Sequence, residues 1–275
     1  MTRWLLLAAL GFGFNVSAEN CTNGLAPAQP PVSAFHKLFK TKKPVMAMIH
    51  LAGGSPRNIM ARFHYEMKIF QETGVDAVVI ENYHAGTEFV ELALKEAQGK
   101  YPNVILGINV LPNEYDQSMV LAHKYGAKFI QMDFVAGKYE PGIELDLEHY
   151  MAYRKAFPDI VVLGGVHPKY YHPVKDSDLA ADIADAMKRA DAVVVTGTGT
   201  GHETPMKKIE AFRKIMGPDF PLVVGAGVTL ENVKPQMAVG DGMIIGSYLK
   251  DGITQNPVRK DLTTAFMKAM AEIRK

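Results

Sequence analysis

The sequence predicts a single (β/α)8 TIM barrel, and three observations support this fold class. Eight short apolar runs rich in β-branched residues recur along the chain, each followed by a stretch with helical spacing. The starts of successive runs lie 20 to 32 residues apart, close to the roughly 30 residues of a βαβ unit. The runs are almost continuously hydrophobic, as expected for parallel strands covered by helices. An open doubly wound sheet uses similar units, but the count of eight and the glycines after the last strands favour the barrel.

We expect the strands, in chain order, at Val45–Leu51, Ala77–Glu81, Val104–Val110, Lys128–Phe134, Ile160–Val166, Ala192–Thr196, Leu222–Gly225 and Gly242–Gly246. Glycines mark the ends of helices between them, because the helical stretches Phe63–Thr73 and Glu114–Tyr125 stop before Gly74 and Gly126. In a barrel, the turns after the helices lie at the stability end, whereas the loops after the strands surround the active mouth. Polar residues at the strand ends are therefore the first candidates for a site.

The composition restricts the kinds of ligand and partner that the chain can bind. The chain has 275 residues, enough for a full-sized core, and its formal net charge is +1 without any block of like charge. This pattern favours a small-molecule ligand and excludes a basic surface for nucleic acid. Cys21 is the only cysteine, so neither an intramolecular disulfide nor a multi-cysteine zinc site can form. A homo-oligomer is compatible with this composition.

The N-terminus differs from the rest of the chain. Arg3 precedes an apolar run over Leu5–Phe14, and Val16-Ser17-Ala18 ends in small residues of the kind that signal peptidases recognise. The run is shorter than the roughly 20 residues that span a bilayer, so no transmembrane segment is expected in the mature form. We divide the chain into a signal peptide (1–18), a flexible leader (19–42) and the barrel (43–275). The expected location is periplasmic or secreted; a cytoplasmic or organellar location is the alternative if the gene start is placed too early.

Every predicted strand delivers a polar group or a glycine to the same rim. The acid–base candidates are His50, Glu81, Asp133, His167 and Lys169, and the polar ligand contacts are Asn82, Asn109 and Thr196. Strand alternation would place His167 and Lys169, two residues apart, on one face. Individually, His50 could be a packing residue and Asp133 could pair with a nearby cation. No cofactor is predicted, although Glu81, Asp133 and His167 together would suit a divalent metal.

Glycines follow the last three strands. We expect Gly225, Gly227, Gly246 and Ser247 to form an anion cradle, supported by Thr198 or Thr200 from the loop after the sixth strand. Glycine lets backbone N–H groups approach an anion closely, and barrels commonly hold a phosphate after strands seven and eight. A side chain at Gly227 would then occupy the space of the phosphate oxygens. The alternative is that these glycines only shape tight turns.

Six segments together resemble the BtpA/SgcQ family. They are MIHLAGGSP (48–56), IENYHA (80–85), GINVLPNE (107–114), VVVTGTGTG (193–201), VVGAGVTLENV (223–233) and IIGSYLKDGITQNPV (244–258). The resemblance implies a barrel of the ribulose-phosphate-binding type. The family includes a thylakoid-associated factor needed for photosystem I accumulation, as well as bacterial members encoded among sugar or nucleoside uptake and phosphorylation genes.

Two function classes follow from this resemblance. The first is an enzyme, a lyase, isomerase or nucleosidase-like protein acting on a phosphorylated sugar or nucleoside-like molecule. The second is a non-catalytic assembly factor for a membrane complex such as photosystem I. Family members commonly have Asp-Val-His-Val-Lys after the fifth strand, whereas this chain has Gly165-Val166-His167-Pro168-Lys169. If the missing acid is a ligand or base elsewhere in the family, the activity of this chain is altered or lost.

Overall fold

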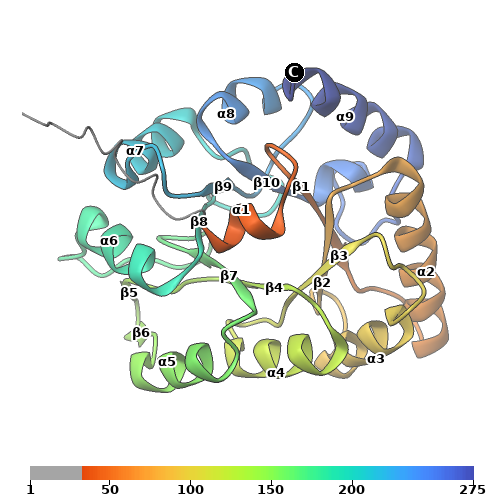
Figure 1. Cartoon of the computed structure of the whole chain (residues 1–275), viewed down its shortest axis with the longest axis horizontal. Helices are drawn as coiled ribbons and strands as arrows, with labels where there is room; N and C mark the ends of the chain where they lie inside the picture. The colour runs from red at the N-terminus through yellow and green to blue at the C-terminus, as the bar shows by residue number, and fades with distance from the viewer. Residues whose placement is uncertain (1–32) are drawn as a thin grey trace, which may run out of the picture. The chain divides into compact units, whose positions relative to one another are not determined.

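The structure is a computed structural model that describes residues 33–275. Eight parallel strands close into a barrel, and helices surround it (Figure 1). The barrel strands are β1 (Val45–His50), β2 (Ala77–Glu81), β3 (Ile105–Asn109), β4 (Phe129–Met132), β7 (Val161–Gly165), β8 (Ala192–Val195), β9 (Leu222–Val224) and β10 (Gly242–Ile245), paired in the order β1-β10-β9-β8-β7-β4-β3-β2. Each strand lies inside its predicted run, so the TIM barrel is confirmed.

Helices follow the barrel strands as the spacing predicts. They are α2 (Pro56–Thr73), α3 (Thr87–Ala97), α4 (Tyr115–Tyr125), α5 (Leu147–Ala156), α6 (Leu179–Arg189), α7 (Met206–Met216), α8 (Val233–Val239), the short 3-10 helix η1 (Ser247–Lys250) and α9 (Lys260–Ile273). The Ser55 hydroxyl accepts a hydrogen bond from Asn58 N at 3.3 Å and caps the start of α2. Gly74 and Gly126 end α2 and α4 in the left-handed conformation, as predicted. No helix within residues 33–275 is long and apolar enough to cross a bilayer.

Apolar side chains fill the barrel in two layers. One cluster lies between the strands and the helices, and a second fills the interior with residues such as Met46, Val79 and Phe129. A Cβ added at Gly107 of β3 would lie 2.3 Å from Cζ of Phe129. The glycine therefore makes room for a large ring inside the barrel, where small and large residues must alternate.

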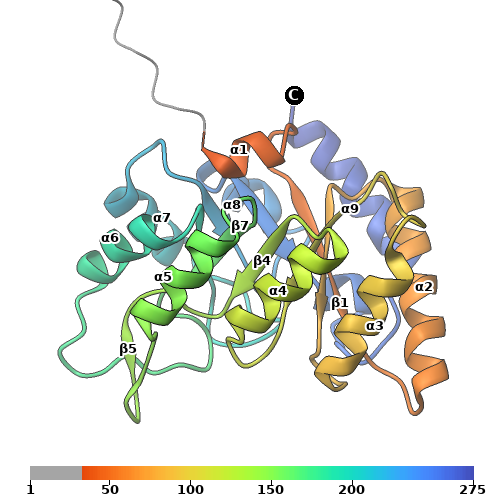
Figure 2. The ribbon, with the colours of Figure 1, turned by 60° about the horizontal axis from the view of Figure 1, so that its bottom comes forward.

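A short helix closes the end of the barrel where the strands begin. Helix α1 (Ala34–Leu38) lies across this end (Figure 2), and Phe35 and Phe39 are only 1% and 4% exposed. The rings of Phe39 and Phe129 pack edge to face with centroids 5.7 Å apart. The expectation of a flexible leader over 19–42 is therefore wrong for residues 34–39, because these aromatic rings are part of the interior core. The predicted signal peptide and the first part of the leader lie outside the described residues.

One element after β4 was not predicted. Strands β5 (Lys138–Tyr139) and β6 (Ile143–Glu144) form a small antiparallel hairpin before α5. Tyr139 is fully buried, and its hydroxyl accepts a hydrogen bond from His167 N at 3.1 Å. The hairpin thus supports the loop that follows β7, which carries part of the site.

Candidate functional site

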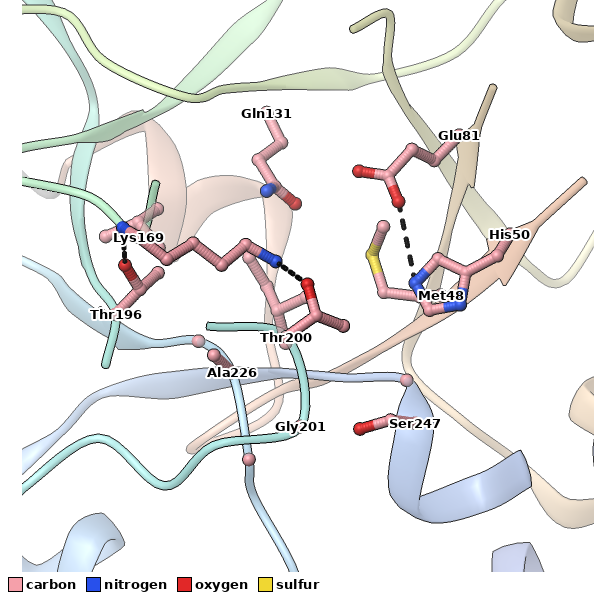
Figure 3. Close-up of a pocket in the computed structure, with 15 residues that line it drawn as sticks. Met48, His50, Glu81, Gln131, Lys169, Thr196, Thr200, Gly201, Ala226 and Ser247 are labelled. Atoms are coloured by element: carbon pink, nitrogen blue, oxygen red, sulfur yellow. Dashed lines mark hydrogen bonds and ion pairs between the residues drawn. The ribbon is translucent and has the colours of Figure 1, made fainter. Parts of the chain in front are cut away.

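A cavity with two adjoining lobes lies at the end of the barrel where the strands stop. Figure 3 shows the residues that line the first of them. The glycine lobe is lined by His50, Thr200, Gly201, Gly225, Ala226, Gly227, Gly246 and Ser247. The tyrosine lobe is lined by Tyr83, Leu111, Asp133, Gly165, Pro168 and Tyr170. Both lobes share Glu81, Gln131, Lys169 and Thr196. Residues from most of the barrel strands therefore converge on one cavity.

Glu81 is a buried carboxyl group that lines both lobes of the cavity. It is the last residue of β2 and only 5% exposed, and Asn109 Nδ2 donates a hydrogen bond of 2.8 Å to its Oε1. Burial raises the pKa of Glu81 to about 7, although the positive charge of Lys169 acts in the opposite direction. A carboxyl group with this pKa can accept and return a proton near neutral pH.

His50 lies beside Glu81 but is held in the neutral form. Its Nε2 is 3.5 Å from Glu81 Oε2. Burial, followed by the positive charges of Lys250 and Lys169, lowers the pKa of His50 well below its ordinary value. Among the described residues, no group forms a hydrogen bond with its buried Nδ1. A neutral imidazole with an unused nitrogen can exchange a hydrogen bond with a ligand without adding charge.

Asp133 and Lys169 complete the set of ionisable groups. Tyr171 donates a hydrogen bond of 3.1 Å to Asp133 Oδ2, and burial raises the pKa of this carboxyl. Lys169 is anchored through its backbone N–H, which donates to Thr196 Oγ1 at 2.8 Å. Its Nζ donates to Thr200 Oγ1 at 2.7 Å and makes no ion pair with any described carboxylate. The ammonium group is therefore available to an anionic or carbonyl group of a ligand.

Thr200 connects the loops around the cavity. Its Oγ1 also accepts a hydrogen bond of 3.0 Å from the Tyr83 hydroxyl, and its backbone N–H donates to the Tyr170 hydroxyl at 2.8 Å. These contacts join the glycine-rich loop after β8 to the loops after β2 and β7. Thr200 therefore lines the cavity, as expected, and its hydrogen bonds hold the surrounding loops together.

Ala226, Gly227 and Ser247 line the glycine lobe. Ala226 and Gly227 both have left-handed φ values, +64° and +60°. Within the described part of the chain, the N–H groups of Ala226, Gly227 and Ser247 donate to no protein acceptor, whereas the N–H of Gly225, which was expected in the cradle, donates to Val195 O at 2.8 Å. Free N–H groups at a shared cavity form a suitable cradle for an anion.

The structure corrects the predicted reason for glycine at Gly227. A Cβ added there would lie 2.3 Å from the backbone carbon of His202 and 2.4 Å from Glu203 N. The side chain would thus meet the loop after β8 rather than ligand space. Gly227 is required for close contact of two loops, and its substitution would disturb the loop regardless of whether the ligand carries a phosphate.

His167 does not lie in the cavity, contrary to prediction. Its Nε2 is 2.7 Å from Asp182 Oδ2 and 3.0 Å from Ser177 Oγ. Strand β7 ends at Gly165, and His167 has a φ of +44°, so strand alternation no longer determines where its side chain points. Serine and aspartate contact the same ring nitrogen, so this group lacks the relay geometry of a catalytic triad.

Three other residues that were predicted to contact a ligand do not line the cavity. Asn82 Oδ1 accepts from Leu111 N at 2.7 Å, and its Nδ2 donates to Leu111 O at 3.2 Å, so it joins the loops after β2 and β3. Asn109 is behind the cavity wall and holds Glu81. Thr198 is exposed, with His202 Nδ1 3.3 Å from its hydroxyl, and does not line the cavity.

The proposed three-residue metal set is not assembled. His167 is held by Asp182 away from Glu81 and Asp133. Residues 33–275 contain no group of three or more His, Cys, Asp or Glu side chains placed to bind a metal ion. Glu81, Asp133 and His167 therefore do not form one ligand set among the described residues.

Sequence reasoning missed several lining residues. Gln131 lines both lobes, and Tyr83 and Tyr170 line the tyrosine lobe. Gln131 could have been found, because it is a polar residue inside the otherwise apolar run Phe129–Met132. The tyrosines could not, because each lies beyond a strand end, where the loop path decides what points inward.

Fold and cavity together define a TIM barrel with a polar, partly amide-lined site at the mouth where barrel enzymes carry their chemistry. The chain belongs to the BtpA family, whose model matches residues 41–272. An uncharacterised protein of Pyrococcus abyssi is 29% identical over 84% of this chain and 97% of its own length. The photosystem I biogenesis protein BtpA of Synechocystis is 26% identical over 85% of this chain and 90% of its own length.

Solved structures agree with this fold. Phosphoribosyl anthranilate isomerase from Thermus thermophilus superimposes with a TM-score of 0.57 at 13% identity, covering 84% of this chain and 99% of the isomerase. At such low identity the likeness concerns the fold alone. A thiamine phosphate pyrophosphorylase from Pyrococcus furiosus shares the fold as well, with a TM-score of 0.55 at 14% identity.

Proposed function

We propose that this chain is an enzyme acting on a phosphorylated small molecule, either a sugar phosphate or a nucleoside-like phosphate. One observation carries the proposal: Glu81, a buried carboxyl group with a pKa of about 7, shares a cavity with the free N–H groups of the glycine lobe. The first feature suits proton transfer and the second suits anchoring of a phosphate. Because both features line one cavity, one small ligand could contact both.

In this proposal, the N–H groups of Ala226, Gly227 and Ser247 bind the phosphate and orient the rest of the molecule. Glu81 accepts or donates the proton, while Asn109 fixes its orientation. Lys169 stabilises negative charge that develops on the reacting oxygen. A lyase, isomerase or nucleosidase-like reaction uses these three roles, and the site favours these classes equally.

Screening of the purified chain against sugar phosphates and nucleotides by thermal shift tests the proposal, with the dephosphorylated form of each compound as its matched control. A ligand that binds the folded state raises the melting temperature by mass action. We expect at least one phosphorylated compound to bind and to be converted, and the conversion to slow by roughly 10²- to 10⁴-fold in Glu81→Gln. If no phosphorylated compound stabilises the chain more than its control, the proposal fails.

The Glu81→Gln variant also tests the alternative of a non-catalytic assembly factor. That role is suggested by the name of the Synechocystis relative, and it needs no proton-transfer group. An assembly factor would tolerate Glu81→Gln, whereas an enzyme would lose turnover. Complementation in cells together with turnover in vitro therefore separates the two functions.

We also propose that the chain is exported after cleavage following Ala18. The support is the sequence pattern of Arg3, the apolar run Leu5–Phe14 and the small residues up to Ala18. Mass spectrometry of the protein recovered from cells should find Glu19 as the first residue. Intact Met1 on protein that remains in the cytoplasm would contradict export.

A further inference from the structure

A cluster of buried charges lies behind the cavity and has no part in the proposed chemistry. Lys250 and Glu66 are both 0% exposed, and Lys250 Nζ is 3.3 Å from Glu66 Oε2. Glu66 Oε1 also accepts hydrogen bonds from Arg62 Nε at 2.8 Å and from Val258 N at 3.2 Å. Two cationic side chains therefore share one carboxylate.

The cluster is coupled to the cavity through η1. This helix begins at Ser247, whose side chain faces the glycine lobe in Figure 3, and ends at Lys250. Three residues of a 3-10 helix advance the chain by about 6 Å. The charge of Lys250 reaches the lining residues, because it adds to the effect of burial in lowering the pKa of His50.

A buried cation is expensive unless an anion compensates it. Lys250 is fully buried, whereas the side chain of Arg62 is 17% exposed. Glu66 can neutralise only one of its two partners. The adjoining glycine lobe offers N–H groups, which bind an anion through hydrogen bonds but supply no full charge. A phosphate held by these amides would bring a full negative charge to the neighbourhood of η1, where two cations share one carboxylate.

We infer that Lys250 is a specificity-determining residue that makes the glycine lobe select a phosphate over an uncharged group, acting through the wall without contacting the ligand. The inference rests on the proposed function, since it concerns the same anion site. Its physical basis is long-range attraction in a region of low dielectric, where one unit charge several ångströms away still has a sizeable effect.

A merely structural role is the competing explanation. Lys250 and Glu66 join η1 to α2, so breaking their contact would loosen the wall. The two roles differ in their dependence on charge. Lys250→Met and Glu66→Gln break the same ion pair, but the first removes a positive charge and the second removes a negative charge. A structural role predicts the same loss in both variants, whereas the electrostatic role predicts opposite effects.

The experiment measures the affinity of the full chain for inorganic phosphate by calorimetry, with phosphate-induced thermal shift as a second readout. We expect Lys250→Met to weaken phosphate binding by roughly tenfold, and Glu66→Gln to strengthen it. Lys250→Gln, which keeps a hydrogen-bond donor near Glu66, serves as a second neutral variant if Lys250→Met does not fold.

The outcomes separate this inference from the proposed function. Wild-type protein that binds phosphate, with equal losses or no change in the two variants, overturns the inference and leaves the proposed function standing. Wild-type protein that binds neither inorganic phosphate nor any phosphorylated compound overturns both. Opposite changes in Lys250→Met and Glu66→Gln support the assignment of Lys250.

Discussion

At the end of the barrel where the strands begin, Phe35 of α1 and Phe39 just after it cover the interior with tightly packed rings. At the other end, the same interior opens into a cavity lined by Glu81, Lys169 and glycines. Of the five buried side-chain atoms without a hydrogen-bond partner within residues 33–275, three lie at or beside this cavity, on His50, Asn109 and Gln131.

The two ends of the barrel contribute oppositely to the free energy of unfolding: the closed end stabilises the fold, and the open end destabilises it. Burial of apolar rings contributes roughly 25 cal/mol per Å² of area removed from water. Buried polar atoms without partners have the opposite effect, each destabilising by about 1–3 kcal/mol. We therefore expect substitutions at the closed end to change stability, and substitutions at the open end to change ligand binding or pH dependence.

Phe35→Ala should give the largest stability effect. Removing a fully buried ring leaves a cavity, so we expect the free energy of unfolding to fall by about 3–5 kcal/mol, measured by chemical denaturation. Tyr65→Ala on α2, where the side chain is 52% exposed, is the control and should change stability little. Phosphate affinity of folded Phe35→Ala should match wild type. Reduced affinity in this variant would break the separation between the two ends.

Glu81→Gln tests the open end through pH. The pKa of Glu81 in the folded chain is about 7, above its ordinary value of 4.5. The folded state thus holds the proton more tightly, and wild-type stability falls as pH rises from 4.5 to about 7. Glutamine cannot ionise, so the variant should be more stable than wild type by about 3 kcal/mol at pH 8. The difference should vanish near pH 4.

Denaturant titrations of both proteins across this pH range provide the measurement. A constant difference between wild type and variant at every pH would mean that Glu81 ionises normally. In that case the pKa of Glu81 would not be raised by burial, and Glu81 would not be suited to the proposed proton transfer near neutral pH.

The barrel was predictable because eight β-branched runs and their spacing are properties of local sequence. Helix α1 was not, because five residues carry no helical periodicity, and Phe35 and Phe39 acquire their role only against the ring of Phe129. Residues on the strands themselves, such as His50 and Glu81, were placed correctly at the cavity. Their alternation along a strand is fixed by the backbone.

Beyond the strand ends, the side-chain positions could not be predicted from strand alternation. His167 was expected beside Lys169, but its left-handed φ turns it toward Asp182. Tyr83 and Tyr170 reach the cavity from loops whose path depends on contacts with Thr200, which lies 117 residues from Tyr83 and 30 residues from Tyr170 along the chain. Such long-range contacts leave no periodic signal in the sequence.

His167→Ala tests whether His167 belongs to the cavity at the open end or only stabilises the loop beside it. The side chain contacts Asp182 and Ser177 outside the cavity, so its removal should lower stability by about 2 kcal/mol while turnover persists. Denaturation and steady-state rates measure the two quantities. Loss of turnover with unchanged stability would return His167 to the catalytic group and require the loop to rearrange when a ligand binds.

The smallest effect is expected from a matched pair in the loop after β8. Thr200→Val removes the hydroxyl that Lys169 Nζ and Tyr83 contact, at 2.7 Å and 3.0 Å, but keeps the side-chain shape. We expect a stability loss of about 1 kcal/mol. Thr198→Val makes the same change at an exposed position of the same loop, so its effect should stay within about 0.5 kcal/mol. Equal effects in the two variants would show that Thr200 does not tie the cavity loops together, because only Thr200 contacts groups that line the cavity.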